Sequence, residues 1–174
     1  MSIKLFSIMF IASAVAMAQG IELGGIAGGG AFGVSSDSTV GIGQAGLQAC
    51  VFCSGRFGLF GEYTHWFSAN GGSNIYATDR IASADLAGGG LRIQPIRLAR
   101  VFFDVGVVGG EDRHVNRRGG ALGGVVVGTG IRIPWGQHWY LRPQFRIYGL
   151  SPHTLEGLDA HWAAAGSLAI GWRF

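Results

Sequence analysis

The chain has 174 residues, of which 13% are charged and 32 are glycine, and its mean hydropathy is positive, at +0.33. A soluble globular protein normally carries about a quarter charged residues, so this composition argues against that class. The formal net charge of +3 is spread over scattered Arg residues and falls by one if Lys4 is removed, which is too weak a basic bias to indicate nucleic acid as a partner.

The first residues have the pattern of a secretory signal peptide. An apolar run follows Lys4 and ends at the small-residue site Ala16-Met17-Ala18. We therefore predict a signal peptide over residues 1–18 and a single domain over residues 19–174. The apolar run is shorter than the roughly 20 residues of a spanning helix, so we expect no membrane helix.

Stretches of alternating residues then follow one another, separated by turn-rich segments. Alternation of period 2 is the signature of a β-strand with two different faces. Eight is also the smallest strand number usual in membrane barrels. We predict strands over residues 20–33, 39–50, 56–67, 80–94, 98–110, 120–133, 138–150 and 159–174. The fold class is therefore all-β, an eight-stranded antiparallel up-and-down transmembrane barrel with both termini on the periplasmic side.

The two faces of the strands differ in polarity. In the segment 138–150, Trp139 and Phe145 lie on one face, while Arg142 and Arg146 lie on the other. A soluble barrel has the same pattern turned inside out, but the polar face here holds mostly Gly, Ala and a few charges, too few to solvate an exterior. We therefore place the apolar face in lipid.

Three further details follow from the sequence. Trp162 and the residue ten positions later, Trp172, would lie about 26 Å apart along the membrane normal, close to the roughly 25 Å between aromatic girdles. In the fourth strand, Leu86 and Leu91 have opposite parity across the triple glycine 88–90, so we expect either a bulge there or a register that differs from the one assumed. Gly136 is available for a positive φ in the short turn after Trp135.

The last eight residues, SLAIGWRF, place Leu168, Ile170, Trp172 and Phe174 on one face. This ending resembles the C-terminal β-signal of outer-membrane barrels, in which Trp172 and Phe174 would be read by the barrel-assembly machinery. With the segments GLFGEYTHWF and WYLRPQFRIYG, the mature chain resembles the small barrels of the outer-membrane protein A and opacity type. The resemblance implies an outer-membrane location and contact with outer-membrane lipid and lipopolysaccharide. We expect a monomer without the peptidoglycan-binding domain of some relatives.

Charged residues of the polar face form the first candidate site. An eight-stranded lumen is only wide enough for side chains, so inward acids and guanidinium groups should pair. We expect a closed polar core and a Glu22–Arg173 pair at the seam of the barrel; the alternative is a gated polar path. The residues of this interior network are Glu22, Glu62, Asp104, Arg132, Arg142, Arg146 and Arg173.

Cys50 and Cys53 form a C-x-x-C motif in a predicted periplasmic turn. Haem attachment would require His directly after the second Cys, where Ser54 stands, and one Cys pair is too few for a zinc site. The alternatives are a disulfide that closes the turn and a redox-active pair. We favour the disulfide, because the motif does not open a helix.

His65 and Ser68 resemble the His–Ser pair on the outer surface of lipid A deacylase barrels. In a regular strand their spacing places them on opposite faces, and the sequence positions no obvious acid to orient His65. We therefore interpret His65 as an interfacial aromatic residue rather than a catalytic one.

The segment GEDRHVNRRGG is the longest charged run and is predicted as an outward loop. Its basic residues would suit a phosphate or carboxylate ligand, although Glu111 and Asp112 offset part of the charge. An ordinary solvated loop is the favoured interpretation. The candidate anion-binding residues are Arg113, His114, Arg117 and Arg118.

The sequence thus favours a non-enzymatic outer-membrane barrel with a structural or surface-interaction role, with no catalytic residues, cofactor or metal. The alternatives are a lipid A-modifying hydrolase of the outer leaflet and an adhesin that binds ligands through its extracellular loops.

The terminal alternation generates a first test. Changing Phe174 to Asp should impair membrane assembly more than secretion, because the apolar end of the last strand would be lost. The yield of heat-modifiable, folded barrel in outer-membrane fractions measures this, and an unaltered yield would contradict the prediction.

Overall fold

A computed structural model describes residues 20–34, 38–68, 81–95, 100–114, 120–152 and 161–174. The predicted signal peptide lies outside these ranges. No helix within them is long and apolar enough to cross a membrane. The strands are β1 (Glu22–Val34), β2 (Ser38–Val51), β3 (Phe57–Ser68), β4 (Ile81–Ile93), β5 (Val101–His114), β6 (Ala121–Ile131), β7 (Ile133–Trp135), β8 (Trp139–Pro152) and β9 (His161–Arg173).

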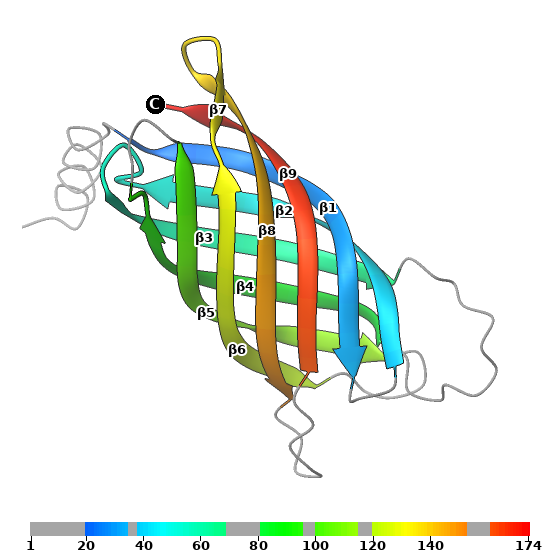
Figure 1. Cartoon of the computed structure of the whole chain (residues 1–174). Coiled ribbons are helices and arrows are strands. Elements are labelled where there is room, and N and C mark those ends of the chain that lie inside the picture. The colour runs from blue at the N-terminus through cyan, green and yellow to red at the C-terminus, as the bar shows by residue number, and fades with distance from the viewer. Residues whose placement is uncertain (1–19, 35–37, 69–80, 96–99, 115–119, 153–160) are drawn as a thin grey trace, which may run out of the picture.

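The strands close into one antiparallel barrel (Figure 1). Each strand pairs with its neighbour in sequence, and β1 pairs with β9 to close the ring. β6 and β7 pair with β8 in one continuous register, from Gly130 opposite Gln144 to Ile133 opposite Leu141, so they form a single strand interrupted at Arg132. The ring therefore has the eight strands that the sequence predicts.

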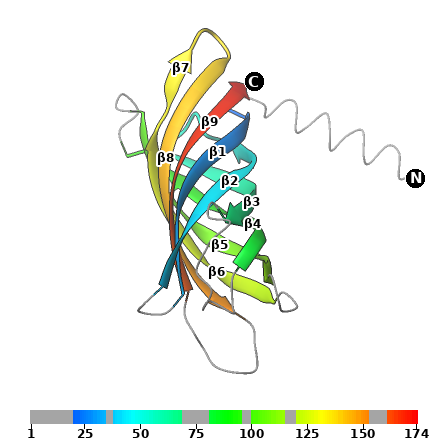
Figure 2. The same cartoon turned by 90° about the vertical axis from the view of Figure 1, so that its right-hand side faces the viewer.

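The barrel has two distinct ends. We call the end where β1 begins and β9 finishes the near end, and the opposite one the far end. The β7–β8 hairpin projects beyond the rest of the near end (Figure 2). Its turn contains Gly136 at a φ of +76°, the positive value that the sequence predicts. At the far end β5 runs past its predicted end at residue 110, because Glu111 and Arg113 continue the ladder opposite Asp85 and Ser83 of β4.

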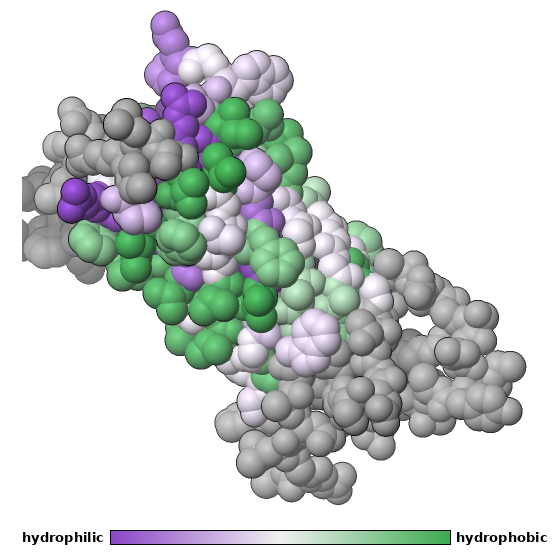
Figure 3. All heavy atoms as spheres, in the orientation of Figure 1, coloured by the Kyte–Doolittle hydropathy of each residue, from purple (hydrophilic) through white to green (hydrophobic). Residues whose placement is uncertain are grey.

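The outer wall is apolar, as the alternation predicts. In β8, Phe145 is 47% exposed while its neighbour Arg146 is 2% exposed. Figure 3 shows apolar side chains gathered over the visible wall and hydrophilic ones near the hairpin. An exposed surface of this kind is stable only against lipid. Among the described side chains, large exposed apolar residues come from every strand of the ring except β4 and include Leu23, Leu47, Leu59, Phe103, Val107, Val125, Val127, Ile147, Leu168 and Ile170.

Of the two alternatives at the triple glycine, the bulge is wrong and the difference in register is confirmed. β4 keeps one register with β3 and β5 through Gly88–Gly90, and the irregularity in its pairing with β5 lies between Ile81 and Ser83 instead. Leu86 has inward parity and is 1% exposed. The prediction failed because it assumed that large apolar residues of a strand all face lipid.

The facing of β8 can be tested with neighbouring residues. Phe145→Arg should lower the free energy of unfolding by about 2–4 kcal/mol, the cost of a lipid-facing charge near mid-bilayer. Gln144→Glu should change it little, because Arg142 and Arg146 flank this inward position. Urea titrations in phospholipid vesicles measure both changes, and equal losses would mean that the facing is wrong.

Candidate functional site

The near half of the lumen contains a network of buried charges, which we call the charged layer. Glu22, at 1% exposure, is held by two guanidinium groups. Nη1 of Arg132 donates to its Oε1 atom, and Nη1 of Arg142 lies 3.1 Å from its Oε2 atom. These contacts join β1 to the strands on the other side of the closing seam.

A second set of ion pairs crosses the lumen. Arg92 donates from Nε and Nη2 to the two oxygens of Asp104, each at 2.7 Å. Arg146 donates from Nη2 to Asp104 at 2.9 Å and pairs through Nη1 with Glu62. Glu62 on β3 and Arg146 on β8 lie on opposite sides of the ring. Arg146 therefore spans the interior and ties three strands together.

Aromatic rings and glycines complete the charged layer. The Arg92 guanidinium lies 4.1 Å from the centre of the Phe102 ring, a cation–π distance. A Cβ at Gly130 would meet that same ring at 2.6 Å, and one at Gly128 would meet Cγ of Arg146 at 2.8 Å. These inward glycines thus make the room that the large side chains fill.

The far half of the lumen is mainly apolar, and we call it the apolar layer. At its centre is Trp66, 2% exposed, with ring centroids 6.3 Å from Phe32 and 4.9 Å from Tyr148 in edge-to-face geometry. The predicted polar core is confirmed, with its ion pairs concentrated in the near half and only a few polar side chains, such as Gln44 and Thr64, buried among the apolar ones of the far half. Other members of this layer are Ile42, Leu86, Val108, Leu122, Val126, Leu150, Ala163 and Ala165.

Two details of the predicted network differ in the structure. Glu22 and Arg173 are partners in the β1–β9 ladder, but the Glu22 carboxylate binds Arg132 and Arg142 instead. Long guanidinium side chains reach across the lumen, so strand adjacency does not decide the pairing. Arg92 is a member of the network that was not predicted, because the triple glycine before it leaves the face of this residue undecided in the sequence.

The near-end turn carries a disulfide between Cys50 and Cys53, and both residues are 1% exposed. The Cys53 carbonyl accepts hydrogen bonds from Gln94 Nε2 at 2.9 Å and Arg132 Nη1 at 3.1 Å. Its backbone N–H donates to the carbonyl of Gly20 at 3.1 Å. The turn therefore connects three separate segments at the mouth of the barrel.

On the outer wall at the far end, His65 has an acid beside it, contrary to the sequence analysis. Nδ1 of His65 lies 2.8 Å from Oδ1 of Asp85, and the Tyr63 hydroxyl donates to the same oxygen at 2.7 Å. His65 and Asp85 are direct partners in the β3–β4 ladder. Only this pairing, invisible in the sequence, reveals the contact.

Among the described residues, no serine hydroxyl makes a hydrogen bond to His65, and Ser83, on the same face of β4 as Asp85, is the ladder partner of Phe67. Ser68 ends β3, and its side chain lies outside the description. On the side of His65 away from Asp85, the ladder partner on β2 is Ala45. The Phe67 ring stacks on the imidazole at 6.4 Å. The described residues therefore supply the acid and the base of a triad but no nucleophile bonded to that base.

Polar side chains continue from His65 across β4 and β5. Glu111 and Arg113 are exposed and alternate with the buried Asp112, which accepts a hydrogen bond from Gly120 N–H at 2.6 Å. Of the predicted anion-binding residues, Arg117 and Arg118 lie outside the described residues, as does the side chain of His114. We define the outer polar patch as Tyr63, His65, Ser83, Asp85, Glu111 and Arg113.

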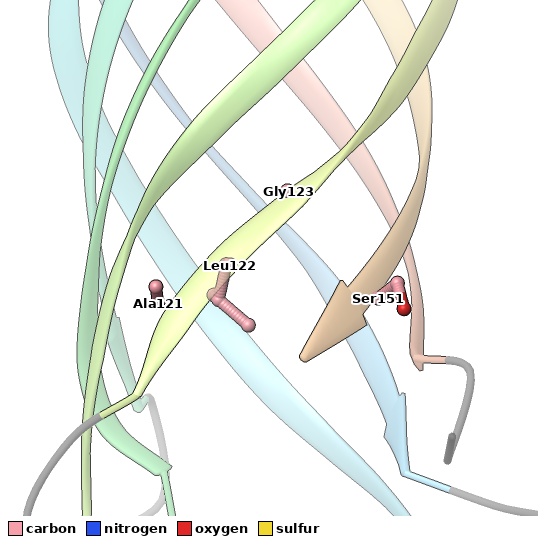
Figure 4. A pocket seen from close by; sticks show the side chains of 4 residues that line it. All are labelled: Ala121, Leu122, Gly123 and Ser151. Atoms are coloured by element: carbon pink, nitrogen blue, oxygen red, sulfur yellow. The ribbon is translucent and has the colours of Figure 1, made fainter. Parts of the chain in front are cut away.

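A hollow lies beside this patch, between β6 and β8 (Figure 4). Ala121, Leu122, Gly123 and Ser151 line it. Nothing lies within 4 Å of a Cβ built on Gly123, so the space beside this residue is open. Ala121 is the ladder partner of Glu111, so the hollow adjoins the patch.

No protein-family model matches this sequence, and no curated protein does. Solved structures do share its fold. Neisserial surface protein A has a TM-score of 0.63 at 10% identity, over 88% of this chain and 97% of its own. The N-terminal barrel domain of Pseudomonas aeruginosa OprF has 0.56 at 11% identity, over 90% and 98%. Ail, the attachment invasion locus protein of Yersinia pestis, has 0.52 at 10% identity, over 89% and 97%. The fold is that of the small eight-stranded outer-membrane barrels.

Proposed function

We propose that this protein is an integral outer-membrane barrel with a closed core, and that it acts through its outer surface and extracellular ends rather than by transport or catalysis. The near end, with both termini, faces the periplasm, and the far end faces outward. The apolar outer wall supports the membrane location. The observation that carries the proposal is the filling of the lumen by two successive layers.

The two layers block the lumen by different means. In the charged layer, Arg146 bridges opposite walls and would have to release Glu62 and Asp104 before an ion could pass. In the apolar layer, the polar groups near Trp66 are few, among them those of Gln44 and Thr64, and they cannot replace the full hydration shell of an ion. A solute that passed the first layer would still meet the second.

The hydrolase alternative gains support from Asp85, which orients His65 as an acid does in a catalytic triad. No described serine makes a hydrogen bond to His65, so we rank the hydrolase below the non-enzymatic proposal. Lipid A mass spectrometry with and without the protein separates the two, because a deacylase would remove an acyl chain.

The charged layer makes a stability prediction. Arg146→Met should cost about 3–5 kcal/mol of unfolding free energy, because Glu62 is left as an unpaired buried charge while Asp104 retains Arg92. Adding Glu62→Gln should recover a large part of the loss. Urea titrations in vesicles measure both variants, and a double variant as unstable as the single one would contradict the pairing.

The closed core makes a conductance prediction. In planar bilayers the wild-type barrel should carry no steady current, and neither should Arg146→Ala nor Trp66→Ala, because each leaves one layer intact. Only the double variant should conduct. Reproducible single-channel steps from the wild-type barrel would overturn the closed-core proposal.

A further inference from the structure

We propose that the outer polar patch, together with the hollow beside it, binds the saccharide head of a glycolipid in the surrounding outer leaflet. This inference rests on the proposed function, which places the far end of the barrel in that leaflet. It adds a ligand class and the residues that recognise it.

The patch is confined to one sector of the wall. Its six members belong to β3, β4 and β5. On β4 and β5 they lie on the far-end side of the last exposed apolar residues of the outer wall, Ala87 and Val107. A general interfacial ring would put polar residues on every strand. Apart from Ser151, the described residues that face outward at this level on the other strands are small or apolar. They are Ala31, Gly43, Ala45, Ala121, Gly123, Trp162 and Ala164.

The polar groups of the patch are held in place before any ligand arrives. Tyr63 and His65 both bind Oδ1 of Asp85, at 2.7 and 2.8 Å. The His65 side chain is 46% exposed and that of Asp85 is 30% exposed, so neither is hidden from a molecule lying against the wall. Fixed side chains lose little conformational entropy when they bind a partner.

The chemistry of the patch fits a sugar better than a phosphate. Asp85 and Glu111 supply two carboxylates that accept hydrogen bonds from hydroxyl groups, while Arg113 is the single formal cation among the six residues. This excess of negative charge disfavours a ligand recognised chiefly by its phosphates. The exposed ring of Phe67, stacked with His65, offers an apolar surface for the C–H face of a sugar ring.

The hollow provides space next to these groups. Glu111 of the patch is the ladder partner of Ala121, and Gly109 is the partner of Gly123 in the floor of the hollow. The exposed hydroxyl-bearing residue Ser151 lies on its far side (Figure 4). A headgroup bound at the patch can therefore extend around the wall without meeting a large side chain at Gly123.

The test uses the full barrel in phosphatidylethanolamine nanodiscs doped with lipid A, with lipid A stripped of its phosphates, or with phosphatidylglycerol. After mild detergent extraction, mass spectrometry measures the lipid that remains bound. Both forms of lipid A should be retained, and phosphatidylglycerol should not. His65→Phe and the double variant Asp85→Asn/Glu111→Gln should each reduce retention roughly tenfold, the loss expected for one hydrogen bond to a charged group.

His138→Phe is the matched control, because His138 is an exposed histidine at the opposite end of the barrel. It should leave retention unchanged, and heat-modifiability shows that each variant is folded. Retention of phosphatidylglycerol equal to that of lipid A, loss of binding on dephosphorylation, or wild-type retention by the patch variants would each overturn the inference. If one of these results is found for a barrel that does not conduct ions, the inference about the glycolipid fails while the proposed function stands.

Discussion

The contact on which the rest of this barrel depends is the bridge of Arg146 to Glu62 and Asp104. Closing eight strands leaves a lumen that side chains must fill, and any charge placed there needs a partner within reach. A guanidinium group meets this need because its rigid fork can bind two carboxylates at once. The inward glycines, the stacked rings and the second cluster around Glu22 all accommodate or extend that arrangement.

The two layers of the lumen also explain why a chain with so few charges forms a stable interior. Ionic contacts hold strands together across the near half, because each buried carboxylate there is bound by guanidinium groups from other strands. In the far half, packing around Trp66 fills most of the space, and the few polar side chains there, such as Gln44, carry no formal charge. Ion pairing therefore stabilises the near half of the barrel, and mainly apolar burial stabilises the far half.

Much of the fold could be predicted from the sequence, since alternation reports strands and their two faces directly. The outward Phe145 and the inward Arg146 follow from parity alone. Contacts between strands could not be read in this way. The pairing of His65 with Asp85 depends on the register of β3 and β4, and the partners of Glu22 depend on how far an arginine reaches. Leu86 was misread because sequence alone does not reveal that half of the lumen is apolar.

The disulfide turn at the near end sets an order of events during assembly. Cys50 and Cys53 are 1% exposed once the ring is complete, and the Cys53 backbone is bound to Gly20, Gln94 and Arg132. Burial of this kind shields the two sulfur atoms from an oxidant in the finished barrel. We therefore expect the bond to form while the chain is still open, so that β2 and β3 are joined by an oxidised turn before β1 meets β9.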